Sequence, residues 1–310
     1  MRAEERRLDI IIPTRNNRDH IIACLEALAR AVDRARRIHG LTVHTWLVDN
    51  ASDDGTPQLV RQTTRWVRVL TLERNAGFAH AVNTAAQHTR GDLWLLNPDT
   101  RPTPESLSLL LRRLYTAPDI GAVGPALLQA DGRPAADGAR GEPTLLREWA
   151  DKVGLTRRYP GMWGYHLGRD LRERDVPVLS GAALLIRRQA WDQVHGLDER
   201  FWLYGEDTDV CVRLRAAGWR CTYVPDARVH HLRGGSARPE ERLTLGLVAL
   251  VSMYRYFAKH KGPSYARAYG WTMKGLALIK WAYWRARGRP EHVRVQQAIL
   301  RARLTHYPNL

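Results

Sequence analysis

The chain has 310 residues, 44% of them hydrophobic, which is enough to bury a large core in one domain with or without an extension. Its three cysteines form no CxxC pair, which argues against structural disulfides and cysteine zinc sites and favours a reduced, cytosolic compartment. We find no signal peptide and no run of about 18 apolar residues that could span a membrane. The formal net charge of +16 leaves nucleic acid, an anionic membrane surface and a phosphate-rich substrate open as partners.

Short apolar runs alternate with amphipathic runs through the first 124 residues. The run Asp19–Arg36 carries apolar residues at helical spacing, and Thr56-Pro57 and Thr103-Pro104 are helix starts with proline at the first helical position. Strand and helix alternating at this spacing predict an α/β fold, Rossmann-like, with a mostly parallel sheet and helices on both faces. The expected strands are Leu8–Ile12, Val43–Val48, Val67–Leu72, Leu93–Leu96 and Ile120–Val123, with a further helix at Phe78–Thr89.

The second half of the chain is less regular. Residues 125–177 are rich in Gly, Pro, Arg and Asp, which predicts a long insert or flexible loop. Val178–Ile186 returns as a strand, and Glu206–Ala216 has the pattern of a helix. Cys221–Val224 is then expected to be a short strand, followed by a His-rich loop and a helical tail.

In such sheets ligands bind at the carboxyl ends of the strands, where this sequence places polar loops. After the first strand, Thr14 and Arg15 offer a hydroxyl and a guanidinium to a nucleotide, or form an ordinary polar turn. After the second, Asp49 accepts hydrogen bonds from a base imide or ribose hydroxyl, or starts an Asx turn that caps the next helix. After the third, Gly77 follows Asn75 and lets the backbone approach a phosphate at a helix N-terminus, unless it is a plain turn glycine.

The fourth loop, Asn97-Pro98-Asp99, offers a single carboxylate. Such a carboxylate is a ligand for Mg²⁺ or Mn²⁺, which completes its shell with substrate phosphates and water, although Asn-Pro-Asp is also a common turn. Much later in the chain, His231 precedes Gly234-Gly235. An imidazole can complete a divalent-metal shell and glycines allow backbone approach to phosphate, whereas a single loop histidine is more often a surface residue.

Two acids, Glu206 and Asp207, open the expected helix Glu206–Ala216, where the helix dipole stabilises their charge. A carboxylate placed there can take a proton from an attacking hydroxyl. The aromatic residues Trp202 and Tyr204 come just before the acids, and aromatic faces beside carboxylates are a common way to hold a sugar ring. The competing interpretation is that the acids only stabilise the start of the helix.

Taken together and in this order, these segments resemble the family-2 glycosyltransferases of the GT-A fold, in their rhamnosyltransferase-like branch. The matching motifs run from Ile10 to about Ser236 and read IIPTRN, VDNASDDGT, RNAGFAHAVN, LNPDT, LSGAALLIRR, GLDERFWLYGEDTDVCVRLRAAG and HLRGGS. One departure is Asn97, which stands where the family keeps the first acid of its DxD metal motif. This replacement lowers the expected metal affinity or rearranges the ligands.

The resemblance implies a GT-A catalytic domain at residues 1–238, with a nucleotide-binding half at 1–124 and an acceptor half at 178–238, and a helical extension at 239–310. Asp207 would be the base of an inverting single displacement, and Asp99 and His231 would hold Mg²⁺ or Mn²⁺. The acceptor and sugar side would comprise Gly181, Trp202, Tyr204 and Glu206. The nucleotide-sugar would be held by Pro13, Thr14, Arg15, Asp49, Arg74, Asn75, Gly77, Asn97 and Asp99.

The implied reaction moves rhamnose from dTDP-rhamnose to a hydroxyl of a polysaccharide or lipid-linked glycan, in cell-wall or polysaccharide synthesis. Two alternatives stay open: a UDP-sugar donor, such as UDP-galactofuranose, and an inactive scaffold relative, for which Asn97 is the best argument. A nucleic-acid-binding protein would explain the charge, but it leaves the acidic strand-end loops unexplained, so nucleic acid is not an expected partner.

The charge is concentrated in the tail. Residues 240–310 carry 13 Lys and Arg against three acids, a balance of +10, which leaves +6 for the first 239 residues. Leu243–Phe257 and Trp271–Trp284 mix basic with apolar and aromatic residues, which suits peripheral contact with the inner face of the cell membrane. The alternative is that these helices pack on the catalytic domain or on a second subunit, and the oligomeric state stays open.

Overall fold

The structure is a computed structural model that describes residues 6–232 and 241–308. Two compact units divide the chain. The sheet unit contains residues 1–142, 164–200 and 206–236, and the helical unit contains 143–163, 201–205 and 237–310. Gly234 and Gly235, named above beside His231, lie outside the described residues.

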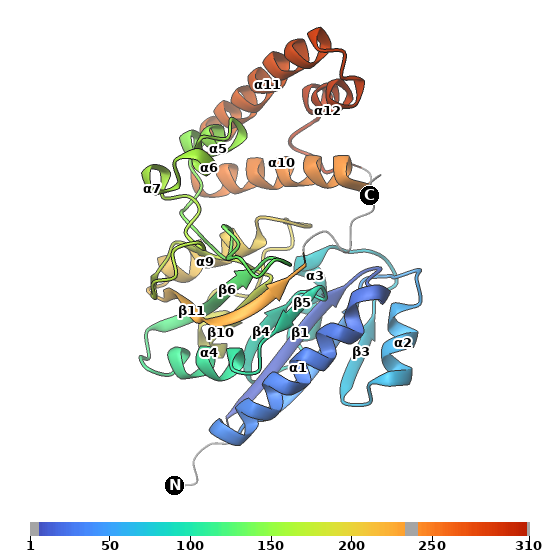
Figure 1. The fold of residues 1–310 in the computed structure, drawn as a ribbon, viewed down its shortest axis with the longest axis vertical. Helices are drawn as coiled ribbons and strands as arrows, with labels where there is room; N and C mark the ends of the chain where they lie inside the picture. The colour runs from blue at the N-terminus through green and yellow to red at the C-terminus, as the bar shows by residue number, and fades with distance from the viewer. Residues whose placement is uncertain (1–5, 233–240, 309–310) are drawn as a thin grey trace. The chain divides into compact units, whose positions relative to one another are not determined.

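The first half of the sheet unit forms the expected alternation of strands and helices (Figure 1). Parallel pairing joins the four strands in the order β3-β2-β1-β4. Buried residues fill these strands on both faces, with Ile10 and Leu47 on one face and Ile11 and Val48 on the other, as a parallel sheet requires. The elements are β1 (Arg7–Thr14), α1 (Arg18–His39), β2 (Thr42–Asp49), α2 (Thr56–Thr63), β3 (Val67–Thr71), α3 (Phe78–Ala86) and β4 (Asp92–Leu96).

The second half extends the same sheet in the order β4-β10-β6-β11-β5, with β8 pairing β11. Strand β10 runs antiparallel to both of its neighbours, and β5 runs antiparallel to β11. Strand β11 runs parallel to β6, so β1, β2, β4, β6 and β11 all point their carboxyl ends to one edge. The elements are β5 (Thr100–Pro102), α4 (Ser106–Leu114), β6 (Ile120–Leu128), β8 (Arg174–Asp175), β10 (Ala183–Ile186), α8 (Arg188–Gln193), α9 (Glu206–Ala216) and β11 (Arg220–His231).

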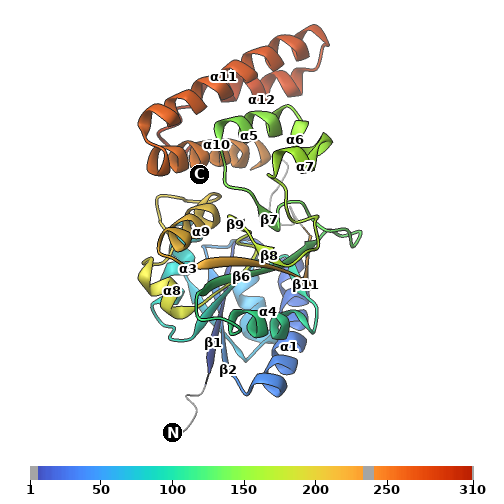
Figure 2. The ribbon, with the colours of Figure 1, turned by 90° about the vertical axis from the view of Figure 1, so that its left-hand side faces the viewer.

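Helices cover both faces of this sheet (Figure 2). Residues of α1, α2 and α4 pack into one buried cluster with the sheet, and residues of α3, α8 and α9 pack into the other. Helix α1 forms because apolar residues recur at helical spacing along the face that it buries, among them Ile21, Leu25, Leu28 and Val32. The helix is capped by Gly40, whose φ of 61° is the left-handed conformation of a C-cap. The α/β fold with a mostly parallel sheet is therefore confirmed.

Three details of the sequence interpretation are wrong. Residues 125–177 are not one loop: they contain the end of β6, the short strand β7 (Ala139–Arg140), the helices α5 to α7 and β8. Val178–Ile186 is split into β9 (Val178–Leu179), which pairs β7, and β10, because Gly181 turns away from the sheet to meet α9. The expected His-rich loop is strand, since β11 continues to His231.

The helical unit is built around aromatic residues. Phe257 of α10 packs against the rings of Tyr265 and Tyr269 of α11, with centroids 5.0 Å away in each case. Helix α5 is tied to α11 where the Leu145 N–H donates to the Tyr265 hydroxyl at 2.7 Å. The helices are α5 (Leu145–Lys152), α6 (Leu155–Arg158), α7 (Pro160–Trp163), α10 (Glu241–His260), α11 (Pro263–Ala286) and α12 (Pro290–Arg301). Among the described helices, none combines the length and the apolar character needed to cross a membrane.

Candidate active site

Thr14 and Asp49 end the neighbouring strands β1 and β2 and are register partners in the parallel ladder. Both side chains are buried. The Thr14 Oγ1 and the Asp49 Oδ1 have no hydrogen-bond partner within the described part of the chain. A buried polar atom without a partner is rare and costly, so two of them side by side indicate a place where a ligand donates hydrogen bonds.

The loops around this pair are braced by Asn50, which the sequence analysis did not single out. Its side-chain amide donates to the Gly77 carbonyl at 3.1 Å, and its oxygen accepts from the Ala76 N–H at 2.8 Å. Gly77 has a φ of 90° at the start of α3, a conformation that a side chain would strain. The Asn50 brace therefore fixes the backbone of the glycine loop next to Asp49.

The capping interpretation of the second loop applies to a different acid, Asp54. Its carboxylate accepts from the Arg18 N–H and from the Thr56 N–H, each at 2.9 Å, and so holds the starts of α1 and α2. Asp49 makes one long contact of this kind, from the Ser52 N–H at 3.3 Å. Arg15 and Arg74 are exposed to solvent, whereas Pro13 is buried and Asn75 accepts a hydrogen bond from the Gly77 N–H.

Asp99 and His231 come together from distant parts of the sequence. Strand β5 pairs antiparallel with the end of β11, so that His231 lies opposite Thr100 and the Leu232 N–H donates to the Asp99 carbonyl. The His231 Nε2 lies 3.3 Å from the Asp99 Oδ1, and both side chains are largely buried. The sequence motifs named both residues, but only the pairing of β5 with β11 explains why they meet.

This pair fits a divalent cation. Two neighbouring ligands of one octahedral Mg²⁺ or Mn²⁺ are about 3 Å apart, and carboxylate and imidazole are both accepted donors. Within the described residues, no group of three or more His, Cys, Asp or Glu forms a larger cluster that could hold a metal. A cation at Asp99 and His231 would therefore take its remaining ligands from a diphosphate and water. Asn97 contributes its backbone, through an N–H that donates to the Ala182 carbonyl.

Asp207 lies in the first turn of α9, where three groups fix its carboxylate. The Gly181 N–H donates to its Oδ2 at 3.2 Å, and the Thr208 N–H donates to its Oδ1 at 2.6 Å. The Arg140 guanidinium donates to both oxygens, at 3.0 and 3.2 Å. A Cβ on Gly181 would come to 3.3 Å from the Asp207 Cβ, which explains why this position is a glycine.

Arg140 is a site residue that the sequence analysis missed. It belongs to the two-residue strand β7, inside the segment 125–177 that the sequence analysis predicted to be a long insert or flexible loop. Its partner Asp207 is 67 positions further along the chain. No local pattern signals such a pair, because it depends on β7 pairing with β9 and on Gly181 lying two residues after the end of β9.

Glu206 is buried beside Asp207, in a different environment. Burial, and secondly the neighbouring charge of Asp207, raise the pKa of Glu206 from its ordinary value of 4.5 to about 8. Glu206 therefore holds a proton at neutral pH, while the Arg140 guanidinium faces the Asp207 carboxylate.

Gly181 and Ala182 connect Asp207 to the loop Asn97-Pro98-Asp99. Gly181 donates to Asp207, and the next residue, Ala182, accepts from the Asn97 N–H at 2.9 Å. Because β10 is antiparallel to β4, its amino end lies at the edge where β4 ends. The sheet therefore brings Thr14, Asp49, Asp99, His231 and Asp207 to one edge. Trp202 and Tyr204 belong to the helical unit, where the Trp202 N–H donates to the Tyr307 hydroxyl, and their sugar-binding role stays a prediction.

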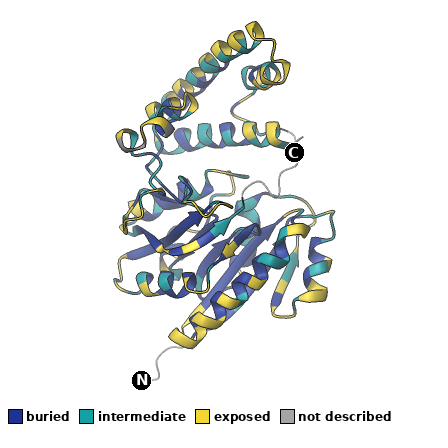
Figure 3. Cartoon of the chain, viewed as in Figure 1, coloured by how far each residue is buried: buried dark blue, intermediate teal, exposed yellow. Residues whose placement is uncertain are grey.

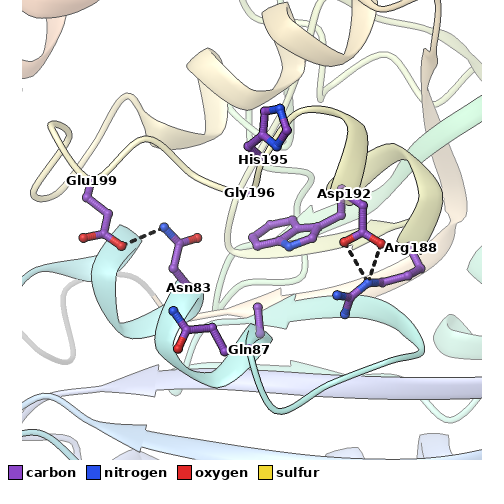
Figure 4. A pocket seen from close by; sticks show the side chains of 9 residues that line it. Asn83, Gln87, Arg188, Asp192, His195, Gly196 and Glu199 are labelled. Carbon is purple, nitrogen blue, oxygen red and sulfur yellow. Dashed lines mark hydrogen bonds and ion pairs between the residues drawn. The ribbon is translucent and has the colours of Figure 1, made fainter.

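A pocket of about 330 Å³ lies elsewhere, between α3 and α8 (Figure 4). None of the residues predicted to bind donor, metal or acceptor lines it. Its polar groups are engaged with each other: Asn83 donates to Glu199, and Arg188 pairs with Asp192. Asn83 also bonds the Leu197 backbone through both its nitrogen and its oxygen, so it joins α3 to the segment before α9.

Comparison with known proteins identifies the chain. The model of glycosyltransferase like family 2 matches residues 6–245. The chain belongs to this family. The glycosyltransferase is 32% identical over 311 residues to the N-acetylglucosaminyl-diphospho-decaprenol L-rhamnosyltransferase of Mycobacterium tuberculosis strain H37Rv, covering 96% of this chain and 95% of the relative. It is also 38% identical over 56 residues, 18% of this chain and 21% of the relative, to the rhamnosyltransferase WbbL of Escherichia coli K12.

Solved structures confirm the GT-A fold of this glycosyltransferase. The mannosyltransferase PcManGT of Pyrobaculum calidifontis, in complex with GDP-Man and Mn²⁺, matches with a TM-score of 0.57 and 18% identity, over 95% of this chain and 74% of that one. The S. aureus TarS fragment 1–349 in complex with UDP matches with a TM-score of 0.54 and 15% identity, over 94% of this chain and 90% of that one.

Proposed function

We propose that this glycosyltransferase moves rhamnose from dTDP-rhamnose to a hydroxyl of a lipid-linked glycan at a membrane surface, with inversion at the anomeric carbon. The observation that carries the proposal is the 32% identity, over 96% of the chain, to a rhamnosyltransferase whose name gives an N-acetylglucosaminyl-diphospho-lipid acceptor. A match along nearly the whole length covers the donor edge and the acceptor residues alike.

The donor is held by the strand-end edge of the sheet. The unpartnered Asp49 Oδ1 accepts from the base imide or a ribose hydroxyl, and the Thr14 hydroxyl lies beside it. Thymine and uracil share the same imide, so this contact fits a dTDP-sugar and a UDP-sugar alike. A divalent cation bound by Asp99 and His231 would neutralise the charge that develops on the departing diphosphate.

Transfer needs one base and no protein nucleophile. Asp207 takes the proton of the acceptor hydroxyl, and the acceptor oxygen forms a bond to the anomeric carbon of the sugar. The bond from that carbon to the diphosphate breaks on the opposite side, and the nucleoside diphosphate leaves with the electron pair. Gly181 and Arg140 hold the Asp207 carboxylate in place for this proton transfer. Glu206, which carries its own proton, leaves Asp207 as the proton acceptor.

The test combines ligand binding with transfer. Thermal unfolding of the purified chain is followed with dTDP, dTDP-rhamnose, UDP and UDP-galactofuranose, each with and without Mn²⁺. We expect a metal-dependent rise in Tm with the dTDP compounds, and rhamnosyl transfer to an N-acetylglucosaminyl-diphospho-polyprenol. A rise in Tm with the UDP compounds alone would show that the donor is a UDP-sugar. No rise in Tm with any nucleotide would favour the inactive scaffold relative.

A further inference from the structure

The outer face of α11 exposes large apolar side chains. Trp271 is 76% exposed, Ile279 is 68% exposed and Leu278 is 54% exposed, with Tyr283 also on the surface. The opposite face of the same helix is buried, through Tyr269, Met273 and Ala277 among others. Helix α11 therefore has two apolar faces. One is buried within the helical unit, and the exposed residues form the other, which lies on the surface.

Basic residues accompany this face, and acids are absent from the helix. Helix α11 contains Arg267, Lys274, Lys280 and Arg285 and no Asp or Glu in its 24 residues. From residue 242 to the end of the chain, the single acid is Glu291. Arg267 and Arg285 are exposed, and in sequence they come before Trp271 and after Ile279. The ribbon of α11 carries exposed residues along much of its length (Figure 3).

Lys280 lies on another side of the helix. Its Nζ donates to the Lys152 carbonyl of α5 at 2.8 Å, and burial lowers its pKa. The helix thus uses one lysine to hold its neighbour within the unit. Arg267, Lys274 and Arg285 are the basic residues nearest the apolar row, at helical spacings of seven or fewer residues from Trp271, Leu278 or Ile279.

We infer that the face of α11 formed by Arg267, Trp271, Lys274, Leu278, Ile279 and Arg285 docks on an anionic phospholipid surface. The apolar side chains would enter the boundary between headgroups and acyl chains, while the basic residues meet lipid phosphates. A second copy of the chain fits this face less well. A two-fold contact would bring its basic residues close to their own copies, and α11 has no acid to pair with them. The inference goes beyond the proposed transfer and does not depend on which sugar is moved.

The test is sedimentation of the full chain with vesicles of phosphatidylcholine, alone or mixed with phosphatidylglycerol. We expect binding to the mixed vesicles that weakens with added salt, and little binding to the neutral ones. The double variant Trp271→Ser, Ile279→Ser should lower the affinity by about tenfold or more. The control is Trp66→Ser, an exposed tryptophan of the sheet unit, which should leave binding unchanged.

The charge is tested separately. Arg267→Gln and Arg285→Gln should each lower binding to anionic vesicles by about fivefold, with Arg37→Gln, an exposed arginine of α1, as the matched control. Unchanged binding by the Trp271, Ile279 double variant would overturn the inference. The inference would also be overturned if sedimentation velocity showed a dimer of the wild-type chain that the same double variant converts to a monomer. Transfer to a water-soluble acceptor analogue should be unaffected in every variant, so loss of membrane binding and failure of the proposed reaction are distinguishable.

Discussion

Thr14 and Asp49 stand opposite each other at the ends of β1 and β2, each with a buried oxygen that no described group contacts. We predict that Thr14→Val leaves the free protein as stable or up to about 1 kcal/mol more stable, because an unsatisfied buried hydroxyl is removed. The rise in Tm caused by dTDP should shrink in the same variant. Thermal unfolding with and without dTDP measures both effects.

The matched control for that prediction is Thr63→Val on the exposed end of α2, where the hydroxyl bonds the Leu59 carbonyl. This control variant should show the same dTDP-induced rise in Tm as the wild type. An undiminished dTDP effect in Thr14→Val would show that the hydroxyl does not contact the nucleotide.

Asp207→Asn should reduce transfer by about 100-fold or more while donor affinity stays near the wild-type value, because the amide cannot accept the proton of the acceptor. Steady-state kinetics and dTDP titration separate the two quantities. Asp192→Asn, on the surface of α8, is the control. Near wild-type turnover in Asp207→Asn would assign the base to another residue.

Arg140→Ala should lower kcat by about tenfold or more, since Asp207 loses the group that holds both of its oxygens. The donor KM should change little, because the Arg140 guanidinium donates to Asp207 and Thr208 of α9, on the proposed acceptor side. Arg140→Lys should recover part of kcat by restoring one hydrogen bond and the charge. Arg133→Ala, a surface arginine, serves as the control. Equal losses in kcat for the lysine and alanine variants would contradict the positioning role.

The raised pKa of Glu206 predicts that the stability of the folded chain depends on pH. Its pKa is raised to about 8 in the folded chain and returns to its ordinary value of 4.5 on unfolding. The folded state therefore binds more protons between these values, so the stability that Glu206 contributes is full below about pH 4.5 and is lost as pH rises to about 8. We predict that Glu206→Gln, which cannot ionise, flattens the fall of Tm across this window.

The control for the pH experiment is Glu105→Gln, at an exposed position before α4. It should leave the pH dependence of Tm as in the wild type. If Glu206→Gln kept the full fall of Tm with pH, the proton would reside on a different group.

His231→Ala should reduce Mn²⁺-dependent donor binding to the level that the wild type shows in a chelator, because one of two protein ligands is lost. Asp99→Ala should act in the same direction. Titration of dTDP at fixed Mn²⁺ measures the effect, with His292→Ala of α12 as the control. If the wild type bound dTDP with the same affinity with and without a chelator, donor binding would not depend on a metal, contrary to the proposal.

The sheet was predictable because its signals are local. Short apolar runs ended by Pro13 or by polar loops mark β1 to β4, and the spacing of apolar residues marks α1. The ordered motifs also identified Thr14, Asp49, Asp99 and His231. Glu206–Ala216 is a helix with the expected bounds, since its acids and apolar residues follow a local pattern.

The rest could not be predicted, because it depends on pairing between distant segments. Arg140 reaches Asp207 only through the short β7–β9 ladder, which no periodic pattern announces. Asn50 looked like one residue in a polar loop, yet its amide joins two loops that lie 26 positions apart. Helices α5 to α7 were hidden because Gly, Pro and charged residues dominate their segment.

The reversed direction of β10 has a consequence for how such enzymes diversify. Because β10 runs opposite to β4, Gly181 and Ala182 at its amino end lie at the edge where β4 ends, and they follow a segment that leaves the sheet after β6 and returns to it at β8. Insertions or deletions between residues 143 and 163 therefore leave the ladder partners of the sheet unchanged. This segment can therefore change in length and sequence during evolution while the strand ends that hold Thr14, Asp49 and Asp99 keep their arrangement.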